Sequence, residues 1–339
     1  MRLTVLAMLL ITLLAVPAFA VDYVMTDLGR GEAFGINDLG QITGWRPDPS
    51  GGPTTAFLWD RSSGFINIGP STGRSINNYG TVAGDGWVWS SDKGLTPLSL
   101  PADSVGVASS AINNLGQIAG WAKSSTGRYQ AILWDSQSEY IVLNAPSGWS
   151  GWAYDINDTG TVVGEFTNEP ENHAFIWGEA TGFIDIGDFG TRFARADGVN
   201  ETGQIVGQYH PGDFRHAFLL DPADGLVDLG TLSGGHHSYS SKINSSGTVV
   251  GASMYIPGNP DPHAFVWNKA TGMVDLGLLG GVISGATDIN SKGEIVGVFR
   301  NSDGLEHIAL WQPVPEPSSL LVLGGGVIGL IGIHKRRRR

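Results

Sequence analysis

The sequence predicts an all-β fold, a seven-bladed β-propeller with four strands in each blade. A nine-residue motif with Asn in its second place and Gly in its fifth occurs seven times, and successive copies start 40, 36, 44, 43, 44 and 46 residues apart. This period matches a propeller blade and is far longer than a leucine-rich repeat. Further strand-like segments recur with the same period, and the two ends of the array complement each other. The copies begin at Ile36, Ile76, Ile112, Ile156, Val199, Ile243 and Ile289.

The centre of each repeat is a tight hairpin. The residue before each Asn and the residue five places after it are β-branched, as strands flanking a turn prefer. A Gly follows each Asn after three places, which fits a type I turn closed by a left-handed residue. We therefore expect the Asn side chain to cap a turn between two antiparallel strands.

The strand that precedes each Asn is expected to be the innermost strand of its blade. A small residue stands four places before every Asn. There is little room where inner strands converge on one axis, so uniformly small side chains favour this placement. The small residues are Ala33, Gly73, Ser109, Ala153, Ala196, Ser240 and Ala286.

Two more segments complete each repeat. The third strand reads HAFIW at residues 173–177, and the closing strand reads GFIDIG at residues 182–187. The seventh repeat ends with HIALWQ at residues 307–312 and has no closing strand of its own. The N-terminal segment Tyr23–Gly29, YVMTDLG, has the closing sequence. We expect it to complete the last blade, which closes a ring and removes a free sheet edge.

A solenoid of the same repeats is the competing architecture, but the matching half-repeats at the two ends favour the ring. The second repeat departs most from the pattern, with Trp87 in place of the Phe and Pro97 in its closing strand. With 339 residues and 41% hydrophobic content, the chain can bury a large core. The absence of Cys excludes a disulfide framework and thiolate chemistry.

The two ends of the chain carry targeting features, which divide it into residues 1–20, 21–312 and 313–339. Residues 1–20 read as a secretory signal peptide, with Arg2, an apolar run and an A-x-A site at Ala18–Ala20. The tail contains the PEP sequence at Pro315, Glu316 and Pro317, an apolar run over residues 320–333 and a basic end. That run is short for a permanent membrane span, and its basic end should stay cytoplasmic.

Both the repeats and the tail resemble known families. The HAF, closing and INxxG segments of residues 22–312 resemble the HAF family of bacterial extracellular repeats, which implies an extracellular protein and no particular activity. The tail resembles the PEP-CTERM sorting signal, which implies export, transient retention in the inner membrane and processing by an exosortase near Pro315, Glu316 and Pro317. A plain C-terminal anchor is the alternative for the tail.

The charge of the repeat region opposes binding to nucleic acid. Without Arg2 and the tail, 14 Lys and Arg stand against 31 Asp and Glu, which gives a net charge of about −17. Such a surface repels phosphate backbones and favours solubility outside the cell.

The lengths of the connections distinguish two faces. The Asn-Gly turn and the turn before the closing strand keep fixed lengths, whereas the two other connections vary. In a four-stranded meander the variable connections share one face, and variable loops on a rigid scaffold often carry binding sites. Aromatic residues beside polar groups suit stacking on sugar rings, although they could equally cover loop cores. The candidates are Trp45, Trp121, Tyr129, Trp149, Trp152, Arg192, Tyr209, His210, His236, His237 and Tyr255.

No catalytic motif emerges from the sequence, which lacks HExxH, GxSxG, a Gly-rich phosphate loop and a Cys nucleophile. Asp155, Lys242 and Asp288, each two places before its Asn, are the ionisable candidates on inner strands. The repeated His173, His216, His263 and His307 read as structural hydrogen-bonding residues, because repeat positions lie a blade apart. We expect no cofactor, although Asp155, Asn157 and Asp158 offer oxygen ligands for calcium.

The sequence therefore predicts a secreted, non-enzymatic monomer that reaches the outer surface or extracellular matrix of a Gram-negative-type bacterium. We expect it to bind extracellular matrix or exopolysaccharide through its variable-loop face. A propeller-fold polysaccharide hydrolase or lyase is the alternative, because a fold alone does not determine function.

Overall fold

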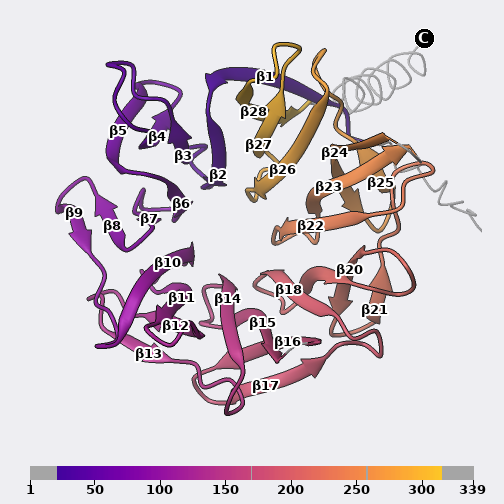
Figure 1. The fold of residues 1–339 in the computed structure, drawn as a ribbon. Coiled ribbons are helices and arrows are strands. Elements are labelled where there is room, and N and C mark those ends of the chain that lie inside the picture. The colour runs from indigo at the N-terminus through magenta and orange to yellow at the C-terminus, as the bar shows by residue number, and fades with distance from the viewer. Residues whose placement is uncertain (1–20, 169, 257–258, 315–339) are drawn as a thin grey trace, which may run out of the picture.

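The computed structural model describes residues 21–168, 170–256 and 259–314. Over these residues the protein is an all-β propeller of seven four-stranded antiparallel sheets around a central axis (Figure 1). The predicted fold class is therefore confirmed. The predicted signal peptide, the apolar run of the tail and the sorting motif Pro315, Glu316 and Pro317 lie outside the described residues. In the part of the chain that is described, no helix is long and apolar enough to cross a membrane.

The first four blades follow the chain in order. Blade one contains β2 (Glu32–Ile36), β3 (Ile42–Arg46), β4 (Thr55–Asp60) and β5 (Gly64–Pro70). Blade two contains β6 (Gly73–Ile76), β7 (Val82–Gly84), β8 (Trp87–Ser90) and β9 (Gly94–Pro97). Blade three contains β10 (Ser104–Ile112), β11 (Ile118–Ser124), β12 (Tyr129–Trp134) and β13 (Tyr140–Val142). Blade four contains β14 (Ser150–Ile156), β15 (Val162–Asn168), β16 (Glu171–Gly178) and β17 (Gly182–Gly187).

The last three blades include the closure of the ring. Blade five contains β18 (Ala194–Val199), β19 (Ile205–Tyr209), β20 (His216–Asp221) and β21 (Gly225–Asp228). Blade six contains β22 (Ser238–Ile243), β23 (Val249–Ile256), β24 (Asn259–Asn268) and β25 (Gly272–Asp275). Blade seven combines β26 (Ile283–Ile289), β27 (Ile295–Arg300) and β28 (Glu306–Pro313) with β1 (Tyr23–Arg30) from the other end of the chain.

The N-terminal strand closes the ring as predicted. β1 pairs antiparallel with β28, with Tyr23 opposite Pro313 and Thr26 opposite Leu310. The His307 imidazole lies 2.9 Å from the Asp27 carboxylate, so a side-chain contact reinforces the backbone pairing. Sequence ends that are 280 residues apart therefore share one sheet, and β28 is not left as a free edge.

The repeated histidines have the structural role predicted for them. Each contacts the Asp of its closing strand at 2.8 to 3.1 Å, and Figure 1 shows these strands at the rim of the blades. The same Asp caps the end of that strand, as where Asp185 accepts a hydrogen bond from the Gly187 N–H at 2.7 Å. The pairs are His173–Asp185, His216–Asp228, His263–Asp275 and His307–Asp27.

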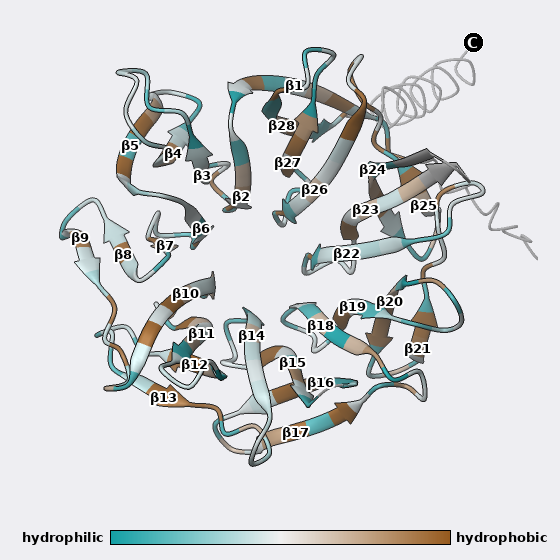
Figure 2. Ribbon diagram, viewed as in Figure 1, coloured by the Kyte–Doolittle hydropathy of each residue, from teal (hydrophilic) through white to brown (hydrophobic). Residues whose placement is uncertain are grey.

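The hydrophobic core lies between neighbouring blades. One cluster of buried residues joins Leu133 of blade three to Val162 and Phe175 of blade four. The strongly hydrophobic stretches in Figure 2 lie on strands such as β27 and β28, whereas the hairpin ends of β22 and β26 are hydrophilic. Each blade therefore buries both faces against its neighbours, and the hairpins meet water.

The small residues do lie on the innermost strands, which surround the axis in Figure 1. The reason given from the sequence is nevertheless wrong, because these residues pack against the preceding blade. Ser240 donates a hydrogen bond at 2.7 Å to the Gly207 carbonyl of blade five. A Cβ atom on Gly73 would lie 2.2 Å from the Thr43 hydroxyl of blade one. Close packing between blades, rather than crowding at the axis, demands small side chains here.

Candidate functional site

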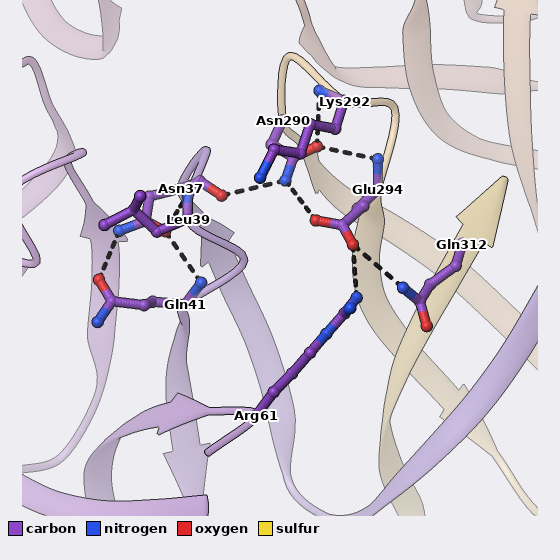
Figure 3. Close-up of polar contacts among 8 residues, drawn as sticks. All are labelled: Asn37, Leu39, Gln41, Arg61, Asn290, Lys292, Glu294 and Gln312. Carbon is purple, nitrogen blue, oxygen red and sulfur yellow. Dashed lines mark hydrogen bonds and ion pairs between the residues drawn. The ribbon is translucent and has the colours of Figure 1, made fainter. Parts of the chain in front are cut away.

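The seven Asn residues of the hairpins form a closed ring around the axis. Asn37 Oδ1 accepts hydrogen bonds from the backbone N–H groups of Leu39 and Gln41 at 3.1 and 2.9 Å, which confirms the predicted turn cap. Its Nδ2 donates to the Asn77 carbonyl oxygen of the next blade at 2.9 Å. The corresponding bond of Asn290 reaches back to Asn37 at 3.1 Å and completes the ring (Figure 3).

Sequence reasoning missed this second bond, although a signal was present. Asp and Ser cap turns as Asn does, yet only Asn also supplies N–H donors. The presence of Asn, and never Asp or Ser, in all seven repeats therefore indicated that the side-chain N–H group also has a hydrogen-bond partner. The remaining bonds run from Asn77 to Asn113, Asn113 to Asn157, Asn157 to Asn200, Asn200 to Asn244 and Asn244 to Asn290, at 2.9 to 3.1 Å.

A shallow polar cavity of about 280 Å³ lies at the mouth of the channel inside this ring. The acidic residues around it are engaged with neighbouring hairpins. Asp38 accepts hydrogen bonds from the Ser291 N–H and the Asn78 side chain at 2.8 Å. Asp158 accepts two from Asn114 at 2.7 Å. These carboxylates hold adjacent blades together, so this mouth is a structural feature of the ring.

The three ionisable candidates on inner strands line the channel. Lys242 contacts the Asp155 carboxylate, which also accepts a hydrogen bond from the Val199 N–H at 2.9 Å. Asp288 accepts one from the Ile36 N–H at 2.8 Å. Burial raises the pKa of Asp288 to about 6, against the opposing influence of Lys242. Asp155 and Asp288 thus fasten strand ends of neighbouring blades, whereas Lys242 of blade six reaches past blade five to Asp155 of blade four.

The residues proposed for calcium do not meet at one point. Asp155 contacts Lys242, Asn157 caps its own turn, and the Asp158 carboxylate binds Asn114. Across residues 21–168, 170–256 and 259–314, no group of three or more His, Asp or Glu side chains is arranged to hold a metal ion.

On the variable-loop face, three aromatic side chains from blades three and four form a group with Lys123, which we name the Trp152 cluster. The Trp121 and Tyr129 rings are 5.2 Å apart, and the Tyr129 and Trp152 rings are 4.7 Å apart. The Lys123 ammonium lies 5.3 Å from the centre of the Tyr129 ring. All four residues are partly exposed. Three of the sequence-predicted candidates are thus brought together.

Polar residues of blades four and five adjoin this group and form what we name the Glu165 cluster. Glu165, opposite Trp152 in the sheet, accepts hydrogen bonds from the Tyr154 hydroxyl at 2.6 Å and from the Asn172 amide at 2.8 Å. The Arg195 guanidinium lies 5.0 Å from the centre of the Tyr154 ring. The cluster consists of Tyr154, Glu165, Asn172, Arg195, Asp197 and Gln208.

The carboxyl groups of the Glu165 cluster are unusually buried. Asp197 is 8% exposed and lies 2.7 Å from Arg195, and it accepts a hydrogen bond from the Gln208 amide at 3.3 Å. Burial raises the pKa of Asp197 to about 6, although Arg195 opposes the rise. The Gln208 Oε1 atom is buried and has no hydrogen-bond partner among the residues that the structure describes. Sequence reasoning missed this cluster; its signal was the polar residue directly after the final Gly of the motif in blades four and five.

A second group on the same face lies between blades five and six. Arg215 donates a hydrogen bond to His210 at 2.7 Å, and its guanidinium lies 4.5 Å from the centre of the Phe193 ring. His236 contacts Phe214, with ring centres 4.4 Å apart. Burial, with a contribution from Arg215, lowers the pKa of both His210 and His237. The sequence identified the three histidines but missed Phe193, Phe214 and Arg215.

Other candidates have different surroundings from those expected. Trp149 packs into the core between blades three and four, 5.1 Å from the Phe166 ring. Tyr209 is 7% exposed and donates a hydrogen bond to Asp228 at 3.1 Å. Trp149 is a loop residue, as expected, but its ring packs against the core. Tyr209 corrects the expectation, because it lies buried on strand β19 and not in an exposed loop. Trp152 likewise lies on the inner strand β14, not in a loop.

The remaining candidates lie apart from these groups. Trp45 donates a hydrogen bond to Glu32 within blade one at 3.2 Å. Arg192 is exposed in the turn before β18. Tyr255 lies on β23, and its side chain is outside what the structure describes.

Comparison with solved structures supports the fold. The chain is similar to a puromycin hydrolase, with a TM-score of 0.59 and 13% identity over 83% of this chain and 51% of the hydrolase. It therefore spans about half the length of that protein. It is also similar to virginiamycin B lyase from Staphylococcus aureus, with a TM-score of 0.57 and 8% identity over 86% of this chain and 100% of the lyase. Likeness at these identities shows the propeller fold alone.

No curated protein matches the chain. Residues 313–338, however, match the PEP-CTERM protein-sorting motif. The motif implies export and sorting through the cell envelope of a Gram-negative bacterium, with processing by an exosortase.

Proposed function

We propose that this exported protein, a propeller of HAF-type repeats, binds extracellular polysaccharide on its variable-loop face and is not an enzyme. The observation that carries the proposal is the Trp152 cluster. Aromatic rings offer flat apolar surfaces against which the C–H face of a sugar ring can stack. The neighbouring Glu165 cluster supplies carboxylate, amide and guanidinium groups of the kind that bind sugar hydroxyls.

The fold itself does not require these aromatic rings. Trp152 stands five places before its Asn, and the same place in the other blades holds residues of every type: Glu32, Thr72, Ala108, Arg195, Tyr239 and Gly285. All seven blades nevertheless form complete four-stranded sheets. A partly exposed aromatic group that most blades lack therefore points to binding rather than to packing.

A glycan array followed by calorimetry tests the proposal. We expect Trp152→Ala and Trp121→Ala each to weaken binding of the selected polysaccharide by about 1–2 kcal/mol, because stacking area is lost. The matched control is Tyr79→Ala, since Tyr79 is 78% exposed on the opposite face and its removal should leave affinity unchanged. The proposal would be contradicted if wild type and a folded variant with both Trp121→Ala and Trp152→Ala bound every glycan with equal affinity.

A polysaccharide hydrolase or lyase is the second candidate, and the Glu165 cluster is the observation that favours it. A carboxyl group with a raised pKa in the same cluster as a second carboxyl group is an arrangement suited to general acid and base chemistry. Asp197, with its pKa of about 6, and Glu165 are better placed for this than Asp155, Lys242 and Asp288, which fasten strands. Shortening of the bound polysaccharide by wild-type protein, and not by Asp197→Asn, would favour the enzyme.

A further inference from the structure

The face opposite the variable loops carries a group of exposed apolar residues. Two places after each Asn, at the tip of each hairpin, blades one to three carry Leu39, Tyr79 and Leu115, which are 67%, 78% and 61% exposed. We name these three residues the apolar arc. The corresponding residues of blades four to seven are polar, namely Thr159, Thr202, Ser246 and Lys292.

The hairpin fold does not explain the apolar arc. Blades four to seven form the same turn, and Gly160, like Gly40, has a φ of 79° at the place that closes it. The side-chain hydrogen bonds from Asn37 to Asn77 and from Asn77 to Asn113 hold the three hairpins side by side. Adjacent large apolar side chains at such exposure mark an interaction surface.

The chain leaves the propeller on this same face. Gln312, near the end of β28, donates a hydrogen bond at 3.1 Å to Glu294 in the last hairpin, and Glu294 accepts one from Asn290 at 2.8 Å. Asn290 bonds in turn to Asn37, two places before Leu39 (Figure 3). The residues that follow Val314 therefore start beside the hairpin that neighbours the apolar arc.

The length of the tail limits how far a membrane can lie from this face. Five residues, 315–319, separate Val314 from the apolar run that begins at Leu320. A fully extended chain advances about 3.3–3.6 Å per residue, so the run starts at most about 20 Å from the exit point. A tail inserted in a bilayer would hold this face of the propeller close to the lipid.

We propose that the apolar arc rests on the surface of a zwitterionic phospholipid bilayer while the tail is inserted, and that the variable-loop face then points away from the membrane. This inference rests on the transient retention of the tail in the inner membrane, which the resemblance to the sorting signal implies. The exposed carboxylates of Asp92 and Asp135 outnumber the neighbouring cation, Lys93, at the border of the arc and oppose an anionic surface. Amphipathic Tyr and apolar Leu side chains suit the headgroup region.

The chain has no Cys, so single-cysteine variants give site-specific labels. The full chain, exported by a host without exosortase, is reconstituted in phosphatidylcholine vesicles that contain a headgroup-attached spin-labelled lipid. A fluorophore at Tyr79→Cys should be quenched several-fold more than one at Asp213→Cys on the variable-loop face. A label at Thr202→Cys, on the polar part of the hairpin face, should be quenched to an intermediate degree. Leu39→Ser with Leu115→Ser should reduce the quenching at position 79.

Flotation of the vesicles separates the two levels of the proposal. If the protein floats and the labels at positions 79 and 213 are quenched equally, the orientation is overturned while insertion of the tail stands. If the protein does not float, insertion of the tail and the orientation that depends on it both fail. If the label at position 79 is already shielded without lipid and the chain sediments as a dimer, a second copy occupies the arc, and the lipid proposal is overturned.

Discussion

At the scale of single residues, the hairpin Asn performs two tasks with the two ends of one amide. The Asn157 oxygen caps its own turn through Thr159 and Thr161, and the nitrogen reaches the Asn200 carbonyl of the next blade at 2.9 Å. Asn157 is 4% exposed, so the carbonyl it serves lies away from water. A buried acceptor that loses its donor retains the cost of desolvation.

Replacement of Asn157 by Asp separates the two tasks. The carboxylate retains the cap but has no N–H to donate, and its charge faces the Asn200 carbonyl. We expect Asn157→Asp to lower the free energy of unfolding by about 1–3 kcal/mol in urea titrations. Thr159→Ser is the control: it keeps the hydroxyl that donates to Asn157 Oδ1 at 2.7 Å and should cost less than about 1 kcal/mol. An unchanged urea midpoint for Asn157→Asp would mean that the ring contributes nothing.

Asp197 makes the stability of the folded protein depend on pH, and the direction of this dependence follows from its raised pKa. Burial raises its pKa from an ordinary value of 3.8 to about 6, so the folded protein binds this proton more tightly than the unfolded chain. The resulting stability is fully present below about pH 4 and is lost as the pH rises through about 6. The contribution of Asp197 to the free energy of unfolding therefore changes by about 3 kcal/mol between low and high pH.

The test is to measure the free energy of unfolding of wild type and of Asp197→Asn between pH 4 and pH 7. The wild-type free energy of unfolding should fall by up to about 3 kcal/mol over that range because of Asp197. The amide of the variant does not titrate, so the variant should not show this fall. Exposed Asp92→Asn serves as the control for a change of net charge. Parallel curves for wild type and Asp197→Asn would contradict the raised pKa.

At the scale of elements, the second strand of a blade depends on its final motif Gly. Gly164 on β15 lies between Ala153 and Phe175 in the sheet. A Cβ atom there would lie 2.0 Å from the Trp152 carbonyl and 2.7 Å from the Phe175 ring. The strand can therefore pack only without a side chain at this position.

Substitution of this Gly should be far more damaging than substitution at an open position. We expect Gly164→Ala to destabilise the protein by about 3 kcal/mol or more, because backbone and ring must both shift. Gly106→Ala on β10 is the matched control, since nothing lies within 4 Å of the added Cβ. Thermal unfolding measures both. Similar melting temperatures for the two variants would show that the blade adapts to the methyl group.

At the scale of the whole molecule, stability depends on closure of the ring. β1 covers the edge of β28, and its Tyr23 and Met25 pack against the core between blades six and seven. A propeller without this strand would expose backbone groups and apolar surface together. Several contacts thus join the ends of the ring, among them the β1–β28 pairing and the Asn290–Asn37 bond.

Deletion of residues 23–29 tests the first of them. We expect a sharply lower melting temperature, or aggregation, because an unpaired strand edge is available to other chains. Asp27→Asn is the control: it alters the contact with His307 but keeps the strand, so the ring should still close. Light scattering and calorimetry distinguish the outcomes, and a deletion variant that melts like wild type would contradict closure by β1.

Orientation of the whole molecule links the two proposals. The tail leaves from the hairpin face, whereas the Trp152 cluster lies on the variable-loop face. A membrane-held protein would therefore present its proposed polysaccharide site outward.

The sequence by itself determined the repeat count, the four strands per blade, the Asn turn and the exchange of Tyr23–Gly29 into the last blade. These features follow from local periodicity and turn chemistry, which need no knowledge of neighbouring blades. The sorting motif was equally readable, because it is a contiguous stretch.

Only the tertiary structure decided how side chains of different blades meet. Asn157 and Asn200 are 43 residues apart, yet one donates to the other. Arg195 of blade five lies against Tyr154 of blade four, and Trp152 contacts Tyr129 of blade three. Trp149 lies in a loop, yet its ring packs against the core between blades three and four. Such contacts depend on how far each blade is rotated against the next, and that rotation results from close packing of both blade faces.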